Sequence, residues 1–354
     1  MVKTDYQNNN KNLTPFFIVG TGRCGTQMLR NLLSTNQSIK ITPETHFIPV
    51  LYEKFGLNTL SFDDFYEVLD NTFDSKGNSF LKNCLLDAKH DDPNDFYIKF
   101  KSYIDKYNEN YNIKNYLEMF FIYIYGQNSF IGDKTPHYGI WINDIKKIWP
   151  DAKIIHLVRD GVNTAESMTN HNGFRNTIES KIDVYNLCKF KYHNKDQKIS
   201  LDSKVSIEDA LIFWEKVILK TIEELDKLPE EDVLTIKYED LILFPAREVV
   251  KIAEFLGFDK NETWINKAIQ IPKPFPENKQ IDKFSAEQYE YYYNKVKSTM
   301  EKLGYPYNFK IKRTPIEFIK EFYRGRSYYL DQIKYKSLLK RFKKASSKIA
   351  KEQK

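Results

Sequence analysis

The chain has 354 residues, of which 41% are hydrophobic and 29% charged, a composition ordinary for a globular protein with one large core or two small ones. The most apolar stretch, residues 116–126, is shorter than the ~20 residues that cross a bilayer, and the first residues show no apolar segment typical of a secretory signal. Three widely spaced cysteines predict neither a disulfide framework nor a zinc knuckle. These features exclude a disulfide-rich scaffold and a bundle of membrane-spanning helices, and we expect a cytoplasmic protein.

Positive charge is concentrated towards the end of the sequence. Residues 310–354 contain 15 Lys and Arg against 4 Asp and Glu. Because the whole chain carries a net charge of +6, the residues before this segment carry −5. A general nucleic-acid binder spreads positive charge over its folded face, so we expect no nucleic-acid partner. We divide the chain into a main domain, residues 1–308, and a basic tail, residues 309–354.

Apolar runs of strand length recur along the chain. They occupy residues 16–20, 129–133, 152–158 and 232–238, and the first, third and fourth each lead into a helical pattern. Alternation of apolar strands with helices is typical of a parallel sheet that is buried on both faces. We therefore predict an α/β fold of three layers, α/β/α, with a central parallel sheet.

The segments between these strands predict helices and one irregular region. Residues 47–127 mix helical periodicity with polar loops and predict a helical insertion over the carboxyl edge of the sheet. Residues 206–228 and 285–302 also have helical patterns, the second of them followed by a Gly and Pro stop signal. Residues 171–204 are polar and aperiodic, and we interpret them as a mobile excursion.

The basic tail contains a further helical pattern. In a helical conformation, residues 338–351 place their apolar side chains on one stripe that is flanked by lysines. One interpretation is a helix that packs on the main domain through this stripe. The other is an interfacial helix that brings the protein to an anionic membrane as a peripheral protein.

The first apolar run leads into a glycine-rich loop and a helical pattern, FFIVGTGRCGTQML. Backbone N–H groups in such a turn, at the positive end of a helix dipole, form an anion site, and Arg23 is the only side-chain cation of the loop. The spacing from Gly20 to Gly25 is that of a phosphate loop, but Thr26 and Gln27 follow where a nucleotide hydrolase has Lys and then Ser or Thr. Gln27 does not replace the hydroxyl that ligates Mg²⁺ in those enzymes. The loop therefore predicts a site for an anion with no γ-phosphate and no magnesium, or else a turn whose glycines serve close packing only.

Four further stretches follow this loop in a recognisable order: ITPETHFIP at 41–49, GDKTP at 132–136, IIHLVRDGVNTAESM at 154–168, and IKYEDLILFPAREVVKIAEFLGF at 236–258. Together with IVGTGRCGT they resemble the sulfotransferase superfamily, especially its bacterial and Golgi-type branch, which includes the tyrosylprotein sulfotransferases. The resemblance covers about residues 15–305. It implies a P-loop-like sheet that binds 3′-phosphoadenosine 5′-phosphosulfate (PAPS) and transfers its sulfuryl group to an acceptor hydroxyl or amine. A phosphosulfate in place of the phosphate chain of ATP accounts for the missing lysine.

The resemblance implies a set of donor-binding residues. The loop residues that match the cradle for the 5′ end of PAPS are Arg23, Cys24, Gly25, Thr26 and Gln27. Arg159 and Ser167 match the pair that holds the 3′-phosphate, and Arg suits phosphate because its planar fork donates two hydrogen bonds at once. Tyr238 matches a residue near the adenine. Relatives commonly have Ser at the position of Cys24, so a backbone contact survives there and a hydroxyl contact does not.

The same resemblance implies the catalytic residues. Glu44 matches the general base and lies past a second short strand, on the reactive edge of the sheet. His46 is the competing base, because the unperturbed pKa of imidazole is closer to neutrality. Lys134 matches the lysine that neutralises charge on the bridging oxygen as the S–O bond lengthens, and Arg23 assists it. The remaining histidines have no metal-ligand spacing, so no metal is implied.

Several residues also have simpler interpretations. Arg159 and Asp160 suit a salt-bridged surface turn, and Asp133 and Lys134 suit a surface pair. Glu44 suits the first turn of a helix, where a carboxylate is favourable. Tyrosine at the end of a strand, such as Tyr238, is usually half-buried packing, and Cys24 is a small residue that fits its place.

Two other functions and several acceptors stay open on the sequence alone. A P-loop kinase of a small molecule is one alternative function, and a non-catalytic binding protein that docks through its basic tail is the other. The acceptor of a sulfotransferase could be a glycan, a lipid-linked sugar, a peptide tyrosine or a small alcohol. We expect the helical insertion and residues 171–204 to line its pocket.

Overall fold

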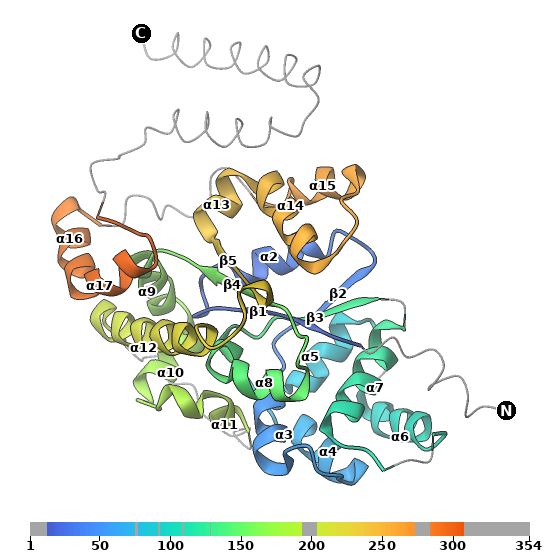
Figure 1. The fold of residues 1–354 in the computed structure, drawn as a ribbon. Helices are drawn as coiled ribbons and strands as arrows, with labels where there is room; N and C mark the ends of the chain where they lie inside the picture. The colour runs from blue at the N-terminus through green and yellow to red at the C-terminus, as the bar shows by residue number, and fades with distance from the viewer. Residues whose placement is uncertain are drawn as a thin grey trace, which may run out of the picture.

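The computed structural model describes residues 13–74, 77–90, 93–107, 110–127, 129–192, 204–272 and 284–307. At its centre lies a five-stranded parallel sheet with the strand order β2-β3-β1-β4-β5 (Figure 1). The strands are β1 (Phe16–Val19), β2 (Ile39–Thr42), β3 (Phe130–Asp133), β4 (Ile154–Val158) and β5 (Val233–Lys237). All four apolar runs that the sequence marks as strands are strands, and their parallel arrangement is confirmed.

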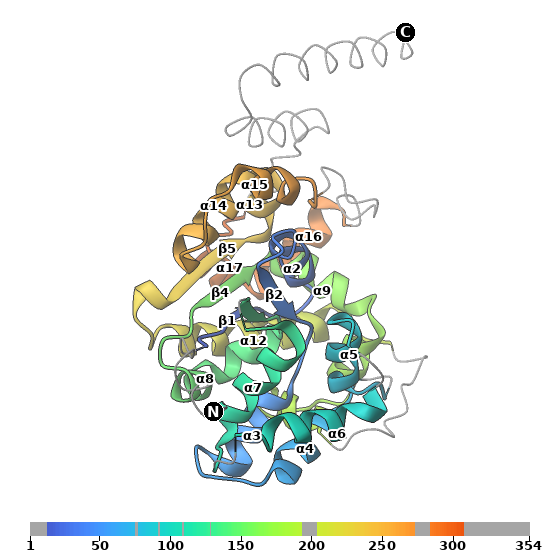
Figure 2. The same ribbon diagram turned by 90° about the vertical axis from the view of Figure 1, so that its right-hand side faces the viewer.

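Helices cover both faces of this sheet, as β1 shows most directly. Successive side chains of a strand point to opposite faces, and every residue of β1 is buried. Phe16 and Ile18 share a core with α2 (Thr26–Leu33), α14 (Pro245–Leu256) and α15 (Glu262–Ala268). Phe17 and Val19 belong to a second core on the other face. The two helical layers lie above and below the sheet in Figures 1 and 2, so the predicted three-layer architecture is confirmed.

The second core is built largely by the predicted helical insertion. Its helices are α3 (Phe47–Phe55), α4 (Phe62–Asp70), α5 (Phe80–Asp87), α6 (Pro93–Ile104) and α7 (Ile113–Tyr125). Ser61 and Ser79 cap the first turns of α4 and α5, because each hydroxyl accepts a hydrogen bond from a backbone N–H of that turn. The insertion covers one face of the sheet, and α5 with the turn before it reaches the carboxyl edge.

The remaining helices follow β3, β4 and β5. They include η1 (Pro136–Trp141), α8 (Ile142–Ile148), α9 (Gly161–Thr169), α12 (Ile207–Leu225), η3 (Glu230–Asp232), α13 (Tyr238–Leu243), α16 (Ala286–Lys295) and α17 (Lys297–Lys302). The helix predicted at 206–228 is α12. The pattern at 285–302 forms two helices instead of one, because the backbone of Val296 leaves the helical region at φ −125° and ψ 21°. Apolar residues of α9, α12 and α16 form a third core.

Residues 171–204 differ from the sequence-based interpretation. They contain α10 (Asn172–Glu179), η2 (Val184–Asn186) and α11 (Leu187–Lys191), so calling the segment a mobile excursion is wrong for its first part. The helices are too short to show periodicity in the sequence, but Leu187 and Cys188 are fully buried against other elements. Tertiary packing therefore orders a segment that its own pattern does not predict. Residues 193–203 lie outside the described part of the chain.

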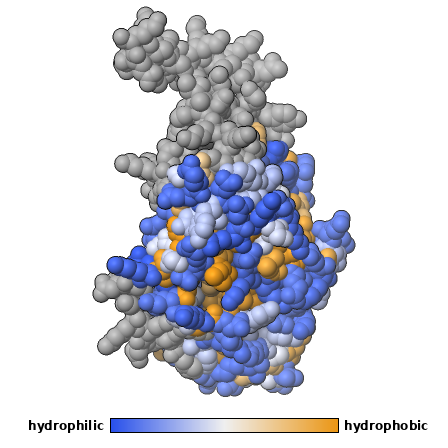
Figure 3. Space-filling view, turned by 90° about the vertical axis from the view of Figure 1, so that its left-hand side faces the viewer, coloured by the Kyte–Doolittle hydropathy of each residue, from blue (hydrophilic) through white to orange (hydrophobic). Residues whose placement is uncertain are grey.

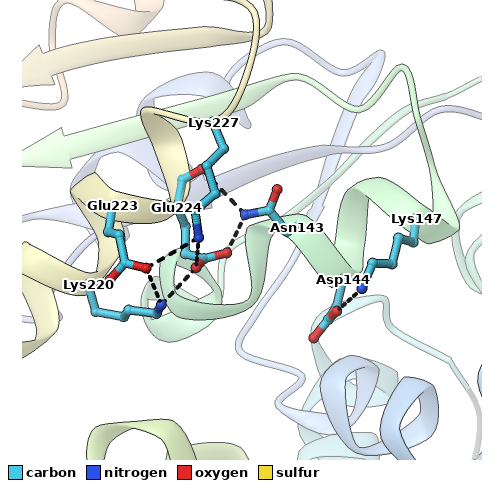
Figure 4. A network of polar contacts seen from close by, with 7 residues as sticks. All are labelled: Asn143, Asp144, Lys147, Lys220, Glu223, Glu224 and Lys227. Carbon is cyan, nitrogen blue, oxygen red and sulfur yellow. Dashed lines mark hydrogen bonds and ion pairs between the residues drawn. The ribbon is translucent and has the colours of Figure 1, made fainter.

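A polar network joins α12 to α8 (Figure 4). Glu224 of α12 forms ion pairs with Lys220 at 2.9 Å and with Lys227 at 2.8 Å. The same carboxylate accepts a hydrogen bond from the amide of Asn143 in α8. The network therefore holds these two helices together in addition to the apolar core.

The surface and the tail complete the description. Figure 3 looks onto the side of the molecule where α9, α12 and α16 lie in Figure 1, and it shows mostly hydrophilic surface with apolar groups near the centre. Within the described ranges, no helix combines the length and the apolar character needed to cross a bilayer. The predicted basic tail at 309–354, with its helical pattern at 338–351, lies outside the described residues.

Candidate active site

The glycine-rich loop between β1 and α2 has backbone conformations that favour glycine. Gly22, Arg23 and Gly25 have φ angles of 75°, 54° and 102°. Gly25 is the N-cap residue of α2 and forms no side-chain cap, and the first turn of this fully described helix contains no acidic residue. The backbone N–H groups and the positive dipole at this end of α2 are therefore suited to an anion.

Two aromatic rings pack directly on the glycines of the loop. A Cβ atom at Gly22 would lie 2.2 Å from Cζ of Phe174, and a Cβ atom at Gly25 would lie 2.3 Å from Cδ2 of Tyr238. Only a residue without a side chain allows such an approach. The glycines do serve close packing, as one interpretation of the sequence expected, and they do so around the uncapped end of α2.

Two guanidinium groups lie beside this helix end. Arg159 follows β4 and donates through Nη1 to the carbonyl oxygen of Arg23 at 3.0 Å, while Arg23 donates through Nε to Oγ of Ser167 at 3.2 Å. Cζ of Arg159 lies 4.6 Å from the ring centroid of Tyr238, within cation–π distance. Burial and the charge of Arg159 lower the pKa of Arg23. An anion bound here would offset the repulsion between the two cations.

The other predicted loop residues have different environments. Cys24 is buried, and its Sγ packs so close to Gly20 that a Cβ atom there would lie 2.7 Å away. Burial raises the pKa of the Cys24 thiol. Thr26 is buried as the first residue of α2, whereas Gln27 is exposed and donates to Oδ1 of Asn31 at 2.8 Å. Cys24 thus has a neutral thiol, and the Gln27 amide is engaged along the surface of α2.

A second group of predicted residues meets where β2 and β3 end. The two strands pair with Thr42 opposite Asp133, so the residues that follow them lie side by side. Nζ of Lys134 donates to Oε1 of Glu44 at 3.0 Å, and Nε2 of His46 lies 3.0 Å from Oε2 of the same carboxylate. Lys134 and His46 are buried, whereas 39% of the Glu44 side chain is exposed. The carboxylate is therefore the accessible member of this cluster.

The surroundings keep Glu44 ionised and His46 neutral. Burial alone would raise the pKa of the Glu44 carboxyl, but Lys134 and His46 hold it well below its usual range. Burial lowers the pKa of His46 despite the neighbouring carboxylate. A neutral imidazole whose Nε2 faces a carboxylate carries its proton on that nitrogen, and its other nitrogen, Nδ1, lies 3.7 Å from Sγ of Cys188. In this tautomer His46 presents no lone pair to a substrate beside Glu44.

A buried hydrogen-bond network supports the cluster from behind. Oδ2 of Asp133 accepts from Oγ1 of Thr42 at 2.7 Å and from Oγ1 of Thr45 at 2.8 Å, and Oγ1 of Thr45 lies 2.6 Å from the hydroxyl of Tyr138. Burial raises the pKa of Asp133 to about 6. These contacts fix the ends of β2 and β3, and so they fix the segments that carry the carboxylate and the lysine.

Two simpler interpretations of these residues are wrong. Asp133 and Lys134 are not a surface pair, because both are buried and the lysine pairs with Glu44 instead. Glu44 does not belong to the first turn of a helix, because α3 begins at Phe47 after His46, whose φ is 58°. The positive φ of His46 turns the chain between β2 and α3, which leaves Glu44 at the edge of the sheet.

Two carboxylates near Arg159 accept hydrogen bonds from tyrosines of the C-terminal part of the described chain. Asp160, directly after Arg159, accepts from the hydroxyl of Tyr289 at 2.5 Å. Glu239, at the start of α13, accepts from the hydroxyl of Tyr305 at 2.6 Å, and the backbone N–H of Asp160 donates to it at 3.3 Å. Burial raises the pKa of both carboxyls. Asp160 is therefore a buried group and not half of a surface turn.

A pocket of about 640 Å³ opens beside Glu44 and Lys134. Its walls include the turn before α5, α5 itself, the start of α10 and the last residue of α11. Residues of the insertion and of the described part of 171–204 line this pocket, and their expected place around the acceptor stays a prediction. Sequence reasoning assigned no role to His137, Phe174 or Lys191, which also line it. Phe174 and Lys191 lie within residues 171–204, which were expected to line an acceptor pocket as a segment, and His137 stands directly after the KTP motif.

Comparison with known proteins finds similarity to sulfotransferases. The family model described as "Sulfotransferase family" matches residues 15–262. Protein-tyrosine sulfotransferase 1 of Danio rerio is 23% identical over 274 residues, which are 75% of this chain and 59% of that protein. A putative protein-tyrosine sulfotransferase of Caenorhabditis elegans is 26% identical over 124 residues, 35% of this chain and 38% of that protein. The chain therefore spans less than two thirds of these curated relatives.

The sulfotransferase domain from the curacin biosynthetic pathway aligns with a TM-score of 0.44 and 17% sequence identity. That alignment covers 81% of this chain and 99% of the other.

Proposed function

The chain belongs to the sulfotransferase family, and we propose that it transfers a sulfuryl group from PAPS to an acceptor hydroxyl. The observation that carries this proposal is the juxtaposition of two groups at one edge of the sheet. The uncapped end of α2 with Arg23 and Arg159 suits a phosphosulfate donor, and Glu44 with Lys134 suits removal of a proton. A small-molecule kinase is not favoured, because Gln27 stands where a kinase of the P-loop type has a magnesium-binding hydroxyl.

The proposed donor site uses both arginines and the loop. The loop from Gly22 to Gln27 receives the 5′-phosphosulfate at the positive end of the α2 dipole. Arg159 and Ser167 hold the 3′-phosphate. The hydrogen bond from the Arg23 guanidinium to the Ser167 hydroxyl supports this role, because it places Ser167 next to the glycine-rich loop. Tyr238 packs between Gly25 and Arg159, which supports its place beside the adenine.

In the proposed reaction Glu44 acts as the general base. Glu44 accepts the proton of the acceptor hydroxyl while the acceptor oxygen attacks sulfur in line with the departing phosphate oxygen. Lys134 and Arg23 stabilise the negative charge that develops on that bridging oxygen. Glu44 is favoured over His46 because the carboxylate is ionised and accessible, whereas the imidazole is buried with its Nε2 directed at the carboxylate.

Thermal unfolding with nucleotides tests the proposal. Adenosine 3′,5′-bisphosphate, the desulfated product of PAPS, should raise the melting temperature of the full chain, because a ligand that binds only the folded state stabilises it. ATP with Mg²⁺ should not. The reverse result would favour a kinase, and stabilisation without any transfer of labelled sulfate from PAPS to a broad panel of hydroxyl acceptors would favour a non-catalytic binding protein.

A further inference from the structure

The pocket beside Glu44 is lined mainly by neutral polar side chains. Apart from the cluster of Glu44, His46 and Lys134, its wall contains amide, hydroxyl and imidazole groups, namely those of Asn78, Asn83, Asn170, Asn172, Thr177 and His137. Four asparagines in one pocket are unusual for a site that holds an apolar ligand, since such sites are lined mostly by hydrophobic groups. The composition of the wall points to an acceptor rich in hydrogen-bonding groups.

Several of these groups have hydrogen-bonding capacity left over. Within the described residues, the side-chain amide of Asn83 forms no hydrogen bond, and Nε2 of His137 is buried with no partner. Asn170 donates through Nδ2 to Glu166, which leaves its oxygen to accept, and Asn172 accepts from Arg175, which leaves its Nδ2 to donate. The pocket therefore offers donors and acceptors together. A hydroxyl group matches such a mixture because each hydroxyl both donates and accepts.

The charges of the pocket cancel. Glu44 and Asp74 carry negative charge, and Lys134 and Lys191 carry positive charge. Burial lowers the pKa of Lys191, which the carboxylates of Glu44 and Asp74 oppose. A site that selects an acidic acceptor would need an excess of cations, because complementary charge is what favours one partner over another. The described wall has no such excess.

Two phenylalanine rings contribute apolar groups to this polar wall, the half-buried Phe174 more than Phe80, which is 5% exposed. Phe80 lies 4.5 Å from the ring of His46, measured between ring centroids, and Phe174 packs on Gly22 of the loop. Both rings line the pocket. A pyranose ring has the matching character, since its hydroxyls lie around its rim and its C–H groups form an apolar face.

From this combination we propose that the acceptor is an uncharged carbohydrate, bound through its hydroxyls by the asparagine-rich wall and through its C–H face by Phe80 or Phe174. The inference rests on the proposed function. A phenol or a tyrosine side chain brings a single hydroxyl, whereas a sugar ring brings several groups that each donate and accept, so a sugar satisfies more of the spare amide groups. The acceptor chemistry therefore differs from the one named for the relatives from Danio rerio and Caenorhabditis elegans.

The proposed step is balanced without any further reactant. A new bond forms between the sugar oxygen and sulfur while the bond between sulfur and the 5′-phosphate oxygen breaks. The hydroxyl proton passes to Glu44, and the electron pair of the broken bond stays on the phosphate oxygen. The products are a sugar sulfate ester and adenosine 3′,5′-bisphosphate.

An acceptor array with ³⁵S-labelled PAPS tests the proposal on the full chain. The array carries uncharged glycans, acidic tyrosine peptides and simple phenols, and binding of adenosine 3′,5′-bisphosphate is measured separately by thermal shift. We expect label on one or more uncharged glycans and none on the peptides. Stabilisation by the nucleotide with label only on peptides or phenols, or on no glycan, overturns the carbohydrate acceptor and leaves the donor assignment standing. Absence of stabilisation and of all transfer overturns the proposed function itself.

A pair of asparagine variants tests the same idea at the pocket wall. Asn83→Ala should raise the KM for the labelled glycan by about 2- to 12-fold and leave the KM for PAPS unchanged, because it removes hydrogen bonds to the acceptor alone. Asn58→Ala is the matched control, since Asn58 is exposed in the turn after α3 and does not line the pocket. Equal acceptor KM values in the two variants would overturn the role of the wall.

Discussion

The two halves of the candidate site differ in the charges of their side chains. Beside β1 and β4, Arg23 and Arg159 lie close enough that the second helps burial to lower the pKa of the first. Beside β2 and β3, Lys134 lies 3.0 Å from Glu44, and His46 completes a cluster in which the charges are balanced. The first half contains two neighbouring cations whose mutual repulsion a bound anion would offset, whereas in the second half a lysine and a carboxylate already pair with each other.

We assign binding of the donor to the first half of the site and proton transfer to the second half. Two neighbouring guanidinium groups at the uncapped end of α2 favour an anionic donor in its ground state, so we expect them to determine affinity. In the second half Glu44 is ionised and so able to accept a proton, and Lys134 beside it is placed to stabilise developing negative charge. Substitutions in the two halves should therefore change different kinetic constants.

The largest effect should come from Glu44→Gln on the balanced half. The amide is nearly isosteric but does not accept a proton, so we expect kcat to fall by on the order of 10²–10⁴, the usual contribution of a general base. The affinity for adenosine 3′,5′-bisphosphate should not change, as measured by calorimetry. Glu53→Gln, at an exposed position of α3, is the matched control and should leave kcat unchanged. A loss of nucleotide affinity in Glu44→Gln would contradict the proposal that Glu44 serves the reaction and not the binding of the donor.

Arg159→Ala should have the next largest effect, on the cationic half. A charged hydrogen bond to phosphate contributes ~1.5–3 kcal/mol, so the Kd for the donor should rise by roughly 10- to 150-fold with a smaller change in kcat. Arg247→Ala provides the control, because that arginine pairs with Asp240 and Glu248 on α13 and α14. Unchanged donor affinity in Arg159→Ala and in Ser167→Ala would remove the 3′-phosphate assignment.

A smaller effect, visible in a pH profile, should follow from His46→Asn. Glu44 must be ionised to act as a base, so kcat/KM falls as the pH drops through the pKa of this carboxyl. Lys134 and His46 hold that pKa well below its ordinary value of 4.5, against the effect of burial. Without the imidazole, burial is opposed by Lys134 alone, so the acid limb of the profile should move to higher pH. The accompanying loss of kcat should be at most about tenfold.

The same profile decides between the two bases. If His46 were the base, the wild-type protein would show an acid limb near the ordinary pKa of histidine, about 6.5. That limb would disappear in His46→Asn together with most of the activity. Such a result would replace Glu44 by His46 in the proposed mechanism.

The sheet and its loops follow from the sequence because local pattern and tertiary structure agree there. Every residue of β1 and β4 is buried, so these two runs are almost entirely apolar and their pattern is plain, whereas β5 is mostly half-buried and contains Thr235 and Lys237. Glu44 and Lys134 could be placed at one edge because parallel strands end on the same side. The sequence does not predict the contact between Glu44 and Lys134. That contact requires the register that places Thr42 opposite Asp133, and register depends on the partner strand.

Residues of the pocket wall were harder to anticipate. Asn83 and Phe174 belong to helices of eight residues each, and they meet only because the insertion and α10 are brought to the same edge of the sheet. Contacts between residues so far apart in the chain leave no trace in local periodicity. The hydrogen bond from Tyr305 to Glu239 is of the same kind, because the two residues are 66 positions apart in the chain.

The smallest effect is expected from Tyr305→Phe, which removes the hydrogen bond to Glu239. The hydroxyl of Tyr305 bonds to Glu239, which accepts from the backbone of Asp160 next to Arg159, so the C-terminal segment positions the cationic half of the site. Loss of one hydrogen bond of ~0.5–1 kcal/mol should raise the KM for PAPS by about 2- to 5-fold. The KM for the acceptor and kcat should stay constant, because Glu44 and Lys134 lie on the other half. Tyr307→Phe, at an exposed tyrosine two residues away, is the control. An equal rise in both KM values would mean that Tyr305 supports the fold as a whole and that the two halves are not held independently.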